Sequence, residues 1–394
     1  MTRLVLSGNT AQSYAAKLAR VQVISAYPIT PQTTIVEKLA EFVDSGQLDA
    51  QFIKVESEHS ALQACVSASA LGARVYTATS SQGLLLMHEL LHWASGARTP
   101  IVMGVANRGV APPWTIDTDH TDTIAQRDTG WIQYYAESNQ EVLDTVLQAF
   151  RLAEDPEVRL PVMVSEDAFF LTHTVEPVDV PSQDVVDRYL PPRRAVGTLV
   201  PGVRGRLGSF TGPELYTEFR HQTAAAMERA RGVAVDVEAE FARATGRDHG
   251  GPLPTYRTED ADAVLVTMGT VSTTARAVVD SLREEGKKVG LAKLRRFRPF
   301  PVEELRRLGA SVGRLGILAR SFTFGAMGAA ATEVAAALYT SPARPLIRDF
   351  VAGLGGRDLT PAVVRDLYLD LLAHAEPELS WPGLRTMEEV ATHG

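Results

Sequence analysis

Short apolar runs alternate with amphipathic segments along the first part of the chain. The apolar runs are rich in β-branched residues, as is typical of buried strands, and lie at residues 21–27, 52–55, 74–80, 100–106 and 160–166. Helical spacing of apolar positions predicts helices over residues 31–46, 57–73, 82–97 and 139–156, the last with Asn139 as its N-cap. Because strands that alternate with helices form parallel sheets covered on both faces, the pattern predicts an α/β fold.

The alternation stops near Val175 and resumes at Ala261. Prolines and glycines interrupt the segment between them, which predicts a long extended connection and then one or two helices over residues 213–246. Strand and helix patterns then alternate again to residue 339, which predicts a second, smaller α/β domain. The predicted organisation is a first domain over residues 1–175, a connecting segment over 176–256 and a second domain over 257–394.

Composition narrows the classes of partner and compartment. The 394 residues predict two or three domains, and a net charge of −8 argues against a nucleic-acid partner, for which a basic domain is expected. No apolar run approaches the roughly 18 residues of a membrane span, and the N-terminus lacks the pattern of a secretory signal. We therefore expect a cytoplasmic protein.

Cys65 is the only cysteine of the chain. An internal disulfide is therefore excluded, which agrees with a reducing compartment. An iron–sulfur cluster needs about four thiolates, so the chain holds no such cluster by itself. Common phosphate-binding, zinc-protease and serine-hydrolase motifs are also absent.

Candidate chemistry lies where predicted strands end. The turn over residues 27–33, YPITPQT, places the Thr30 hydroxyl between two prolines, which restrict the backbone. Ligands of open α/β sheets bind at the carboxyl ends of strands, so this turn occupies a functional position. The alternative is a rigid turn in which Thr30 or Gln32 caps the next helix.

Two further strand ends carry charged residues. Glu56 and Glu58 follow the strand at 52–55, where a carboxylate is either a functional acid or a first-turn residue favoured by the helix dipole. Asn107 and Arg108 follow the strand at 100–106, where an arginine either binds a ligand carboxylate in a bidentate manner or forms an ion pair between domains. His88 and His92 have helical spacing, and we expect a structural or interface role for them rather than metal binding.

Several motifs, in their order and spacing, resemble the α subunit of pyruvate:ferredoxin oxidoreductase, a thiamine-diphosphate-dependent 2-oxoacid:acceptor oxidoreductase. These motifs are YPITPQT, VESEHSA, TSSQGLLLM, ANRG and DHTDTIAQRDTGW, with later similarity in LPVMVSEDAFFLTHTVEPV, LRRFRPFP and GLGGRDLTP. The resemblance covers nearly the whole chain. It implies a pyrimidine-binding domain of the thiamine-diphosphate fold, followed by a domain like the C-terminal domain of transketolase.

The resemblance also implies roles for individual residues. Glu58 matches the glutamate that hydrogen-bonds N1′ of the aminopyrimidine, in the cofactor-binding role also assigned to Tyr27 and Pro28. Arg108 matches the arginine that binds the substrate carboxylate, and Thr30 matches the hydroxyl that orients the substrate. Asn107 is a weaker candidate for the same pocket, and no metal ligand is predicted.

Asp119 and His120 lie in a matching loop of the family, and we favour structural roles for both residues. The remainder of the predicted site lies outside this chain, as the missing motifs indicate.

The missing motifs imply partners. No G-D-G segment is present to hold Mg²⁺ and the diphosphate; the family carries that half of the site on a β subunit. It also carries 4Fe-4S clusters on the β subunit and on a ferredoxin-like δ subunit, besides a γ subunit. The implied reaction converts pyruvate, CoA and oxidised ferredoxin to acetyl-CoA, CO₂ and reduced ferredoxin.

Other functions are compatible with the same residues. Within the family, the alternatives are a phenylglyoxylate or branched-chain 2-oxoacid oxidoreductase, with NAD as another electron acceptor. An oxalate enzyme is disfavoured because its relatives carry arginine in the place of Thr30. A non-catalytic scaffold would not need Thr30, Glu58 and Arg108 together, and a self-sufficient transketolase-like enzyme would need its own diphosphate-binding motif.

Overall fold

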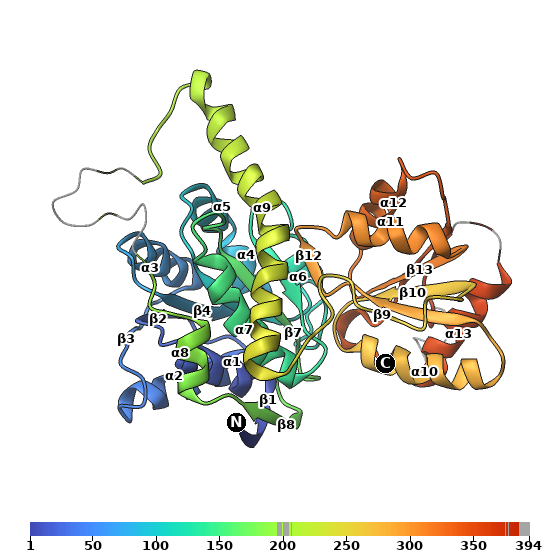
Figure 1. Ribbon diagram of the computed structural model, residues 1–394, viewed down its shortest axis with the longest axis horizontal. Coiled ribbons are helices and arrows are strands. Elements are labelled where there is room, and N and C mark those ends of the chain that lie inside the picture. The colour runs from blue at the N-terminus through green and yellow to red at the C-terminus, as the bar shows by residue number, and fades with distance from the viewer. Residues whose placement is uncertain (195–198, 200–204, 206, 375, 377, 386–394) are drawn as a thin grey trace. The chain divides into compact units, whose positions relative to one another are not determined.

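The computed structural model describes the whole chain except residues 195–198, 200–204, 206, 375, 377 and 386–394 (Figure 1). The chain divides into two compact units. Unit 1 comprises Met1–Pro252 and Arg295–Phe300, and unit 2 comprises Leu253–Leu294 and Pro301–Gly394. The domain boundaries expected at residues 175 and 256 stay a prediction. Among the described residues, no helix combines the length and apolar character needed to span a bilayer.

Unit 1 is built on a seven-stranded sheet with the strand order β12-β6-β7-β5-β4-β2-β3. All neighbouring strands in it are parallel except β12 and β6. Its strands are β2 (Val23–Ser25), β3 (Gln51–Ile53), β4 (Val75–Thr79), β5 (Val102–Asn107), β6 (Ile132–Tyr135), β7 (Val162–Asp167) and β12 (Arg296–Arg298). A separate antiparallel ribbon pairs β1 (Thr2–Ser7) with β8 (Val175–Val180).

Helices cover both faces of this sheet, as the alternating pattern predicts. One face carries α1 (Gly8–Leu18), α2 (Thr33–Asp44) and α7 (Asn139–Ala153), which share one apolar core with the sheet. The other face carries α3 (Glu58–Ala70), α4 (Ser81–Leu86) and α5 (His88–Gly96), which share a second core. The remaining helices of the unit are α6 (Thr121–Ile124), α8 (Gln183–Tyr189) and α9 (Pro213–Thr245). The predicted α/β fold is confirmed.

Unit 2 contains a smaller sheet with the strand order β15-β14-β13-β10-β11-β9. Its strands are β9 (Thr255–Tyr256), β10 (Ala263–Thr267), β11 (Val289–Lys293), β13 (Arg314–Ala319), β14 (Leu346–Val351) and β15 (Leu379–Ser380). Its helices are α10 (Val271–Glu284), α11 (Val302–Ser311), α12 (Ala329–Leu338), the short 3₁₀ helix η1 (Leu354–Gly356) and α13 (Pro361–Ala373). Four parallel strands, β11-β10-β13-β14, form its centre, as expected for an α/β unit.

Some local expectations differ from the structure. The N-cap of α7 is Ser138, whose hydroxyl accepts a hydrogen bond from the Glu141 N–H. Asn139 instead donates its side-chain amide to the carbonyls of Leu6 and Thr174, which ties the helix to the β1–β8 ribbon. Both residues are good caps, and only the tertiary contacts decide which of them occupies that position.

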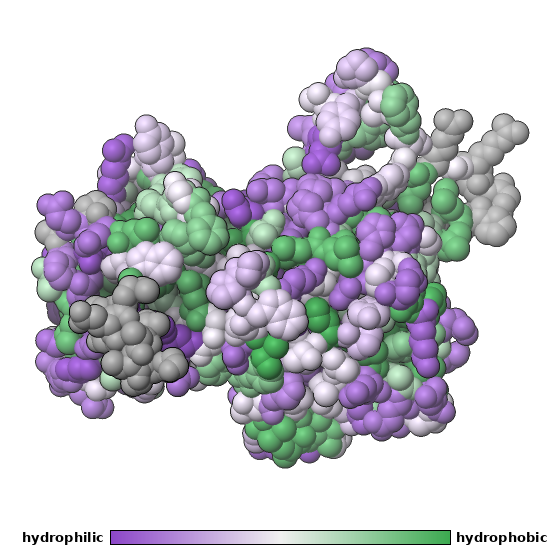
Figure 2. All heavy atoms as spheres, turned by 180° about the vertical axis from the view of Figure 1, so that it is seen from behind, coloured by the Kyte–Doolittle hydropathy of each residue, from purple (hydrophilic) through white to green (hydrophobic). Residues whose placement is uncertain are grey.

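The segment after Val175 is also more ordered than an extended connection. It forms β8 and α8 before the described part of the chain reaches α9. The single helix α9 ends at Gly246, which has a left-handed φ of 76° that glycine adopts without steric cost. On the outer face of the β1–β8 ribbon, Val5 is 67% and Val175 60% exposed, beside the Arg3–Asp179 ion pair. Figure 2 shows hydrophobic side chains gathered at the lower edge of that view.

Arg295 anchors α7 through a buried ion pair within unit 1. Its Nε lies 2.7 Å from Glu141 Oε1, and its Nη1 lies 2.9 Å from Glu238 Oε1 on α9. The Nη2 donates to Thr145 and Gln148, so each described donor group of this guanidinium meets an acceptor. The two carboxylates raise the pKa of Arg295 despite its burial. Such a matched pair contributes to the fold and leaves no charge for a ligand.

Candidate functional site

Four neighbouring strands of the large sheet place the predicted site residues along one edge. In the order β5-β4-β2-β3, their carboxyl ends lead to Arg108, Gly83, Thr30 and Glu58. Because the strands are parallel, these ends lie at the same edge of the sheet, where ligands of open α/β sheets bind. Residues that are far apart in the sequence therefore reach a common region.

Arg108 and the YPITPQT turn are in direct contact. The Nη1 of Arg108 donates to the backbone carbonyl of Thr30 at 2.7 Å, and its Nε donates to the carbonyl of Thr115 at 3.2 Å. The ring of Trp114 lies 5.4 Å from the guanidinium carbon. Although Arg108 is only 4% exposed, no carboxylate of the described residues lies within ion-pair distance of it. Burial lowers the pKa of Arg108, and the site keeps a cation without a contacting counter-ion.

Hydrogen bonds from Gln32 and Asn9, and not from Thr30, fix the YPITPQT turn. The side chain of Gln32 accepts from the Ile29 N–H and donates to the Ala78 carbonyl, and the Asn9 amide donates to the Pro31 carbonyl. Gln32 is the N-cap residue of α2 but makes no side-chain capping bond. Thr30 is exposed, as are Tyr27 and Pro28. The turn thus presents its outer residues to the surface on a fixed backbone.

The two candidate glutamates have different environments. Glu56 is exposed, and its carboxylate accepts a short hydrogen bond from the Ser60 hydroxyl, which lowers its pKa. Glu58 begins α3 and is only 7% exposed, and no described residue donates a hydrogen bond to its carboxylate. Glu58 is therefore the glutamate whose carboxylate keeps its hydrogen-bonding capacity for a ligand.

Gly83 determines the room available to the Glu58 carboxylate. A Cβ atom built on Gly83 would lie 2.6 Å from Glu58 Oε1 and 2.6 Å from Thr79 Oγ1, so a side chain at position 83 would have to displace the Glu58 carboxylate or Thr79. The preceding turn is strained at Ser81, a non-glycine residue with a φ of 48°. The Ser81 hydroxyl donates to the Gly109 carbonyl at 2.5 Å, which ties this turn to the loop after β5. The TSSQG segment therefore packs against the Glu58 carboxylate.

Asp122 connects the loops after β4 and β5. Its Oδ2 accepts from the N–H groups of Ser81 (3.0 Å) and Arg108 (3.1 Å). Its Oδ1 accepts from the Asn107 amide (2.8 Å) and from the Thr123 N–H (2.7 Å). Burial raises the pKa of Asp122 to about 6, although all four hydrogen bonds favour the ionised form.

Asn107 is fully buried and directed away from the surface. Its amide nitrogen donates to Asp122 and to the Thr123 hydroxyl, whereas no described group donates to its buried Oδ1. Asp119 accepts from the Thr121 N–H, and His120 Nε2 lies 2.6 Å from Asp167 Oδ1 in the interior. A role for Asn107 in contact with substrate stays a prediction.

His88 and His92 pack their rings against each other, 5.1 Å apart. His88 Nδ1 also hydrogen-bonds Gln126 at 2.5 Å. Over the described residues, no group of three or more His, Cys, Asp or Glu side chains is arranged to hold a metal ion.

A further buried carboxyl lies on the opposite face of the sheet edge. Glu166, at the end of β7, receives one long hydrogen bond from Gln12 (3.3 Å), and its Oε2 has no described donor. It lies so close to Gly8 that a Cβ there would be 2.0 Å from Oε2. Burial raises the pKa of Glu166 to about 8. This shift favours the protonated, neutral form of Glu166.

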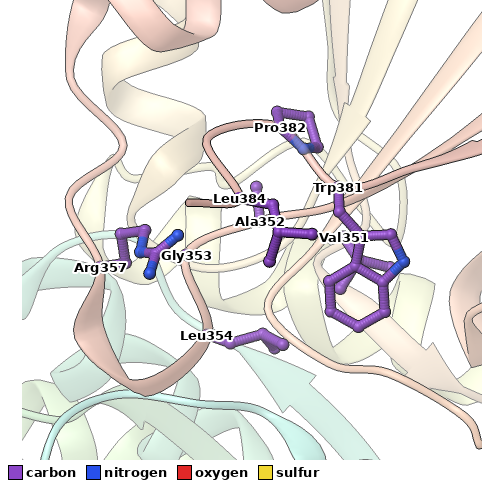
Figure 3. A pocket seen from close by; sticks show the side chains of 8 residues that line it. All are labelled: Val351, Ala352, Gly353, Leu354, Arg357, Trp381, Pro382 and Leu384. Atoms are coloured by element: carbon purple, nitrogen blue, oxygen red, sulfur yellow. The ribbon is translucent and has the colours of Figure 1, made fainter. Parts of the chain in front are cut away.

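Unit 2 contains a small cavity of about 150 Å³ (Figure 3). It lies at the carboxyl end of β14, and Figure 3 shows Arg357 at the left of its lining and Trp381 at the right. Arg357 lines it too, but its Nη1 donates to the Gly383 carbonyl at 2.6 Å. The lining is otherwise apolar and includes none of the predicted site residues.

The sequence did not point to Asp122, Gly83 or Trp114. Asp122 lies in DHTDTIAQRDTGW, but an aspartate in a polar loop is indistinguishable from a solvated one. Gly83 lies inside a predicted helix, where glycine is unfavourable. That unfavourable residue was the sequence feature that could have indicated a close approach at this position.

Comparisons with known proteins relate both parts of the chain to one group. Residues 14–239 match the pyruvate flavodoxin/ferredoxin oxidoreductase thiamine diphosphate-binding family, and residues 261–364 match the pyruvate:ferredoxin oxidoreductase core domain II family. The chain is 50% identical over 387 residues to the ketoisovalerate oxidoreductase subunit VorA of Pyrococcus horikoshii, covering 97% of this chain and 98% of that protein.

A second relative is named for another substrate, pyruvate. The chain is 49% identical over 392 residues to the pyruvate synthase subunit PorA of Pyrococcus furiosus, covering 97% of this chain and 98% of that protein. Among solved structures, it is similar in fold to 2-oxoglutarate:ferredoxin oxidoreductase from Magnetococcus marinus, with a TM-score of 0.72 and 18% identity. That match covers 94% of this chain but only 65% of the other chain.

Replacing Gly83 by alanine tests the close approach of this residue to the Glu58 carboxylate. The new methyl group would overlap the Glu58 carboxylate, so Gly83→Ala is expected to lower the activity of the assembled enzyme at least about 100-fold, the cost of misplacing a reacting group by about 1 Å. Gly96→Ala is the matched control, because Gly96 is also helical and nothing lies within 4 Å of its added Cβ. Equal activities of the two variants, measured as kcat/KM, would contradict the assignment.

The raised pKa of Glu166 predicts a pH-dependent stability. The folded state binds this proton up to about pH 8, whereas the unfolded chain releases it near the ordinary value of 4.5. Between these values the native state holds more protons, so the stability contributed by Glu166 falls as pH rises, by about 1.4 kcal/mol per pH unit at most. Chemical denaturation of wild type and Glu166→Gln from pH 5 to 8 measures this. A difference that is constant with pH would show that Glu166 is ionised throughout.

Proposed function

The chain belongs to the pyruvate:ferredoxin oxidoreductase family, and we propose that it acts as the α subunit that supplies the pyrimidine and substrate side of a thiamine diphosphate site. One observation carries this proposal. Two largely buried residues at the same sheet edge, Arg108 without a contacting carboxylate and Glu58 without a hydrogen-bond donor, keep bonding capacity for ligands. Each has the charge that one of the two expected ligands requires.

The carboxylate of Glu58 fits the N1′ side of an aminopyrimidine. Glu58 would hydrogen-bond N1′ and share a proton with that nitrogen, which its lack of a protein partner leaves it able to do. When bound, thiamine diphosphate supplies the electron sink that decarboxylation of a 2-oxo acid requires. Gly83 would keep the carboxylate accessible, and Tyr27 and Pro28 would border the cofactor from the exposed turn.

Arg108 would bind the substrate carboxylate. With Nη1 and Nε directed at the carbonyls of Thr30 and Thr115, Nη2 has no described acceptor and is the atom that would meet the incoming anion. The Thr30 hydroxyl, on the same turn, would orient the 2-oxo group. The cation would thus fix the reacting carbon near the cofactor, which is the main contribution a binding residue makes to rate.

The other half of the site would come from partner subunits. The chain has no G-D-G segment and one cysteine, so Mg²⁺, the diphosphate and 4Fe-4S clusters would be held by a β subunit and a ferredoxin-like δ subunit, alongside a γ subunit. Electrons would pass to ferredoxin and the acyl group to CoA. Cys65, buried with a pKa raised to about 12, supports a cytoplasmic location because it has no cysteine partner in the chain.

Pyruvate is the proposed substrate, and a branched-chain 2-oxo acid is the second candidate. The near-equal identity to pyruvate synthase and ketoisovalerate oxidoreductase subunits favours keeping both. They share the carboxylate and the 2-oxo group that Arg108 and Thr30 would bind, and differ only in the alkyl group. A few methylene groups change specificity by only about 1–3 kcal/mol each, so the distinction rests on the pocket wall of the assembled enzyme.

Purification of the complex that contains this chain tests the proposal. CoA-dependent reduction of ferredoxin is expected with pyruvate giving a higher kcat/KM than 2-oxoisovalerate or phenylglyoxylate. The chain alone is expected to bind thiamine diphosphate and Mg²⁺ weakly by calorimetry, because it lacks the diphosphate side. Tight Mg²⁺-dependent binding to the chain alone would contradict the divided site, and a preference for 2-oxoisovalerate would establish the branched-chain alternative.

Substitution of Arg108 tests the carboxylate-binding role. Arg108→Ala is expected to lower kcat/KM for the 2-oxo acid by about 2–4 kcal/mol, the cost of truncating one member of a buried charge pair. Arg108→Lys should restore only part of this, because an ammonium lacks the planar fork.

Arg98→Ala is the matched control for Arg108. Arg98 is also partly buried and donates to the carbonyls of Val158 and Arg159, away from the strand ends. Its loss is expected to leave KM for the 2-oxo acid unchanged. If Arg108→Ala alters exchange of the C2 proton of the cofactor but not KM, Arg108 belongs to the cofactor side of the site.

A further inference from the structure

We propose that Asp122 is the positioning residue of this site, whose carboxylate holds Arg108 and the turn before Gly83 in the arrangement that binds the 2-oxo acid. The inference rests on the proposed function. It adds a residue that contacts neither ligand and acts through the two loops that do. Asp122 is fully buried on the four-residue helix α6, and besides the N–H of the next residue, Thr123, it meets donors from two other segments.

The first of these segments is the end of β5. The N–H of Arg108 donates to Asp122 Oδ2, and the neighbouring Asn107 amide donates to Oδ1. The backbone from which the guanidinium projects is therefore fixed on two sides. The negative charge also favours the charged form of Arg108, but it forms no direct ion pair with the guanidinium, which stays able to bind a ligand.

The second segment is the turn after β4. The Ser81 N–H donates to the same Oδ2, and this contact accompanies the left-handed conformation of Ser81. A strained residue persists only where its surroundings over-determine it, and here Asp122 and the Gly109 carbonyl both bind Ser81. Two residues later, Gly83 makes its close approach to Glu58. One carboxylate thus links the substrate side of the site with the cofactor side.

A carboxylate is required because all four partners are donors. In Asp122→Asn, one side-chain oxygen could still accept, but the NH₂ group would face N–H groups and repel them. In the double variant Asn107→Asp/Asp122→Asn, the two side chains exchange roles. The NH₂ group at position 122 would then face the carboxylate at position 107. The amide oxygen introduced at position 122 would then be available to the N–H groups of Arg108 and Ser81. The double variant is therefore expected to regain part of what the single variant loses.

Asp119→Asn is the matched control. Asp119 lies three residues earlier in the same loop and is also buried, but among the described residues its carboxylate accepts a hydrogen bond only from the Thr121 N–H and from neither strand end. General damage to this loop would affect both variants, whereas loss of positioning would affect only Asp122→Asn.

The test uses the assembled complex and two readouts. Kinetics give kcat and KM for pyruvate and CoA, and calorimetry gives the affinity for oxamate, an unreactive pyruvate analogue with the same carboxylate. Asp122→Asn is expected to weaken oxamate binding and raise KM for pyruvate about tenfold or more, as for loss of a charge-assisted hydrogen bond, with KM for CoA unchanged. The double variant is expected to bind oxamate more tightly than Asp122→Asn, and Asp119→Asn is expected to bind it like wild type.

Two results would overturn the proposal. One is wild-type oxamate affinity in an assembled Asp122→Asn complex. If that variant does not assemble, the other is an assembled double variant that binds oxamate no better than Arg108→Ala. Arg108→Ala also separates the two hypotheses, because an unchanged oxamate affinity there contradicts the proposed function itself. Weak binding by Arg108→Ala with normal binding by Asp122→Asn contradicts only the role of Asp122.

Discussion

The buried carboxylate of Asp122 ties together the loops on which the carboxyl edge of the large sheet depends. Removing a charge from water is costly, and here four donors from three segments offset that cost. The pKa of Asp122 is raised to about 6, because burial raises it by more than the four hydrogen bonds lower it. Asp122 binds the N–H groups of Ser81 and Arg108 and so holds both backbones in place. The Ser81 turn leads to Gly83, which packs against Glu58, and the Arg108 side chain binds the Thr30 carbonyl.

Buried charged residues of unit 1 differ in whether side chains of opposite charge contact them. Arg295 meets the carboxylates of Glu141 and Glu238, so its charge is compensated inside the fold. Arg108 and Glu58 are nearly as buried. Among the described residues, Arg108 meets two backbone carbonyls but no carboxylate, and Glu58 receives no hydrogen bond from any donor. A fold tolerates such unmatched groups where a ligand completes them, which is the physical basis for assigning the edge to a cofactor and an anionic substrate.

Much of the fold could be predicted from the pattern of apolar residues. The strands at the centre of both sheets are fully buried, and their β-branched runs are unmistakable, as in β5 and β10. The edge and ribbon elements, such as β1 and β12, were not predicted. Strand β1 is mostly exposed and mixed in polarity, and β12 has only three residues, two of them arginines, so neither carries a sustained apolar run. The break between α4 and α5 at Met87 was hidden because both helices carry the same apolar spacing.

The sequence by itself determined the alternation of strands and helices, the motifs at the strand ends and the absence of a diphosphate-binding segment. These properties are local, since each depends on residues within one turn or one strand. Tertiary structure alone decided that Glu58 rather than Glu56 is buried, that Arg108 contacts the Thr30 carbonyl, and that Asp122 joins two loops. Burial and hydrogen-bond partners depend on segments tens of residues apart, and the parallel sheet brings those segments to one edge.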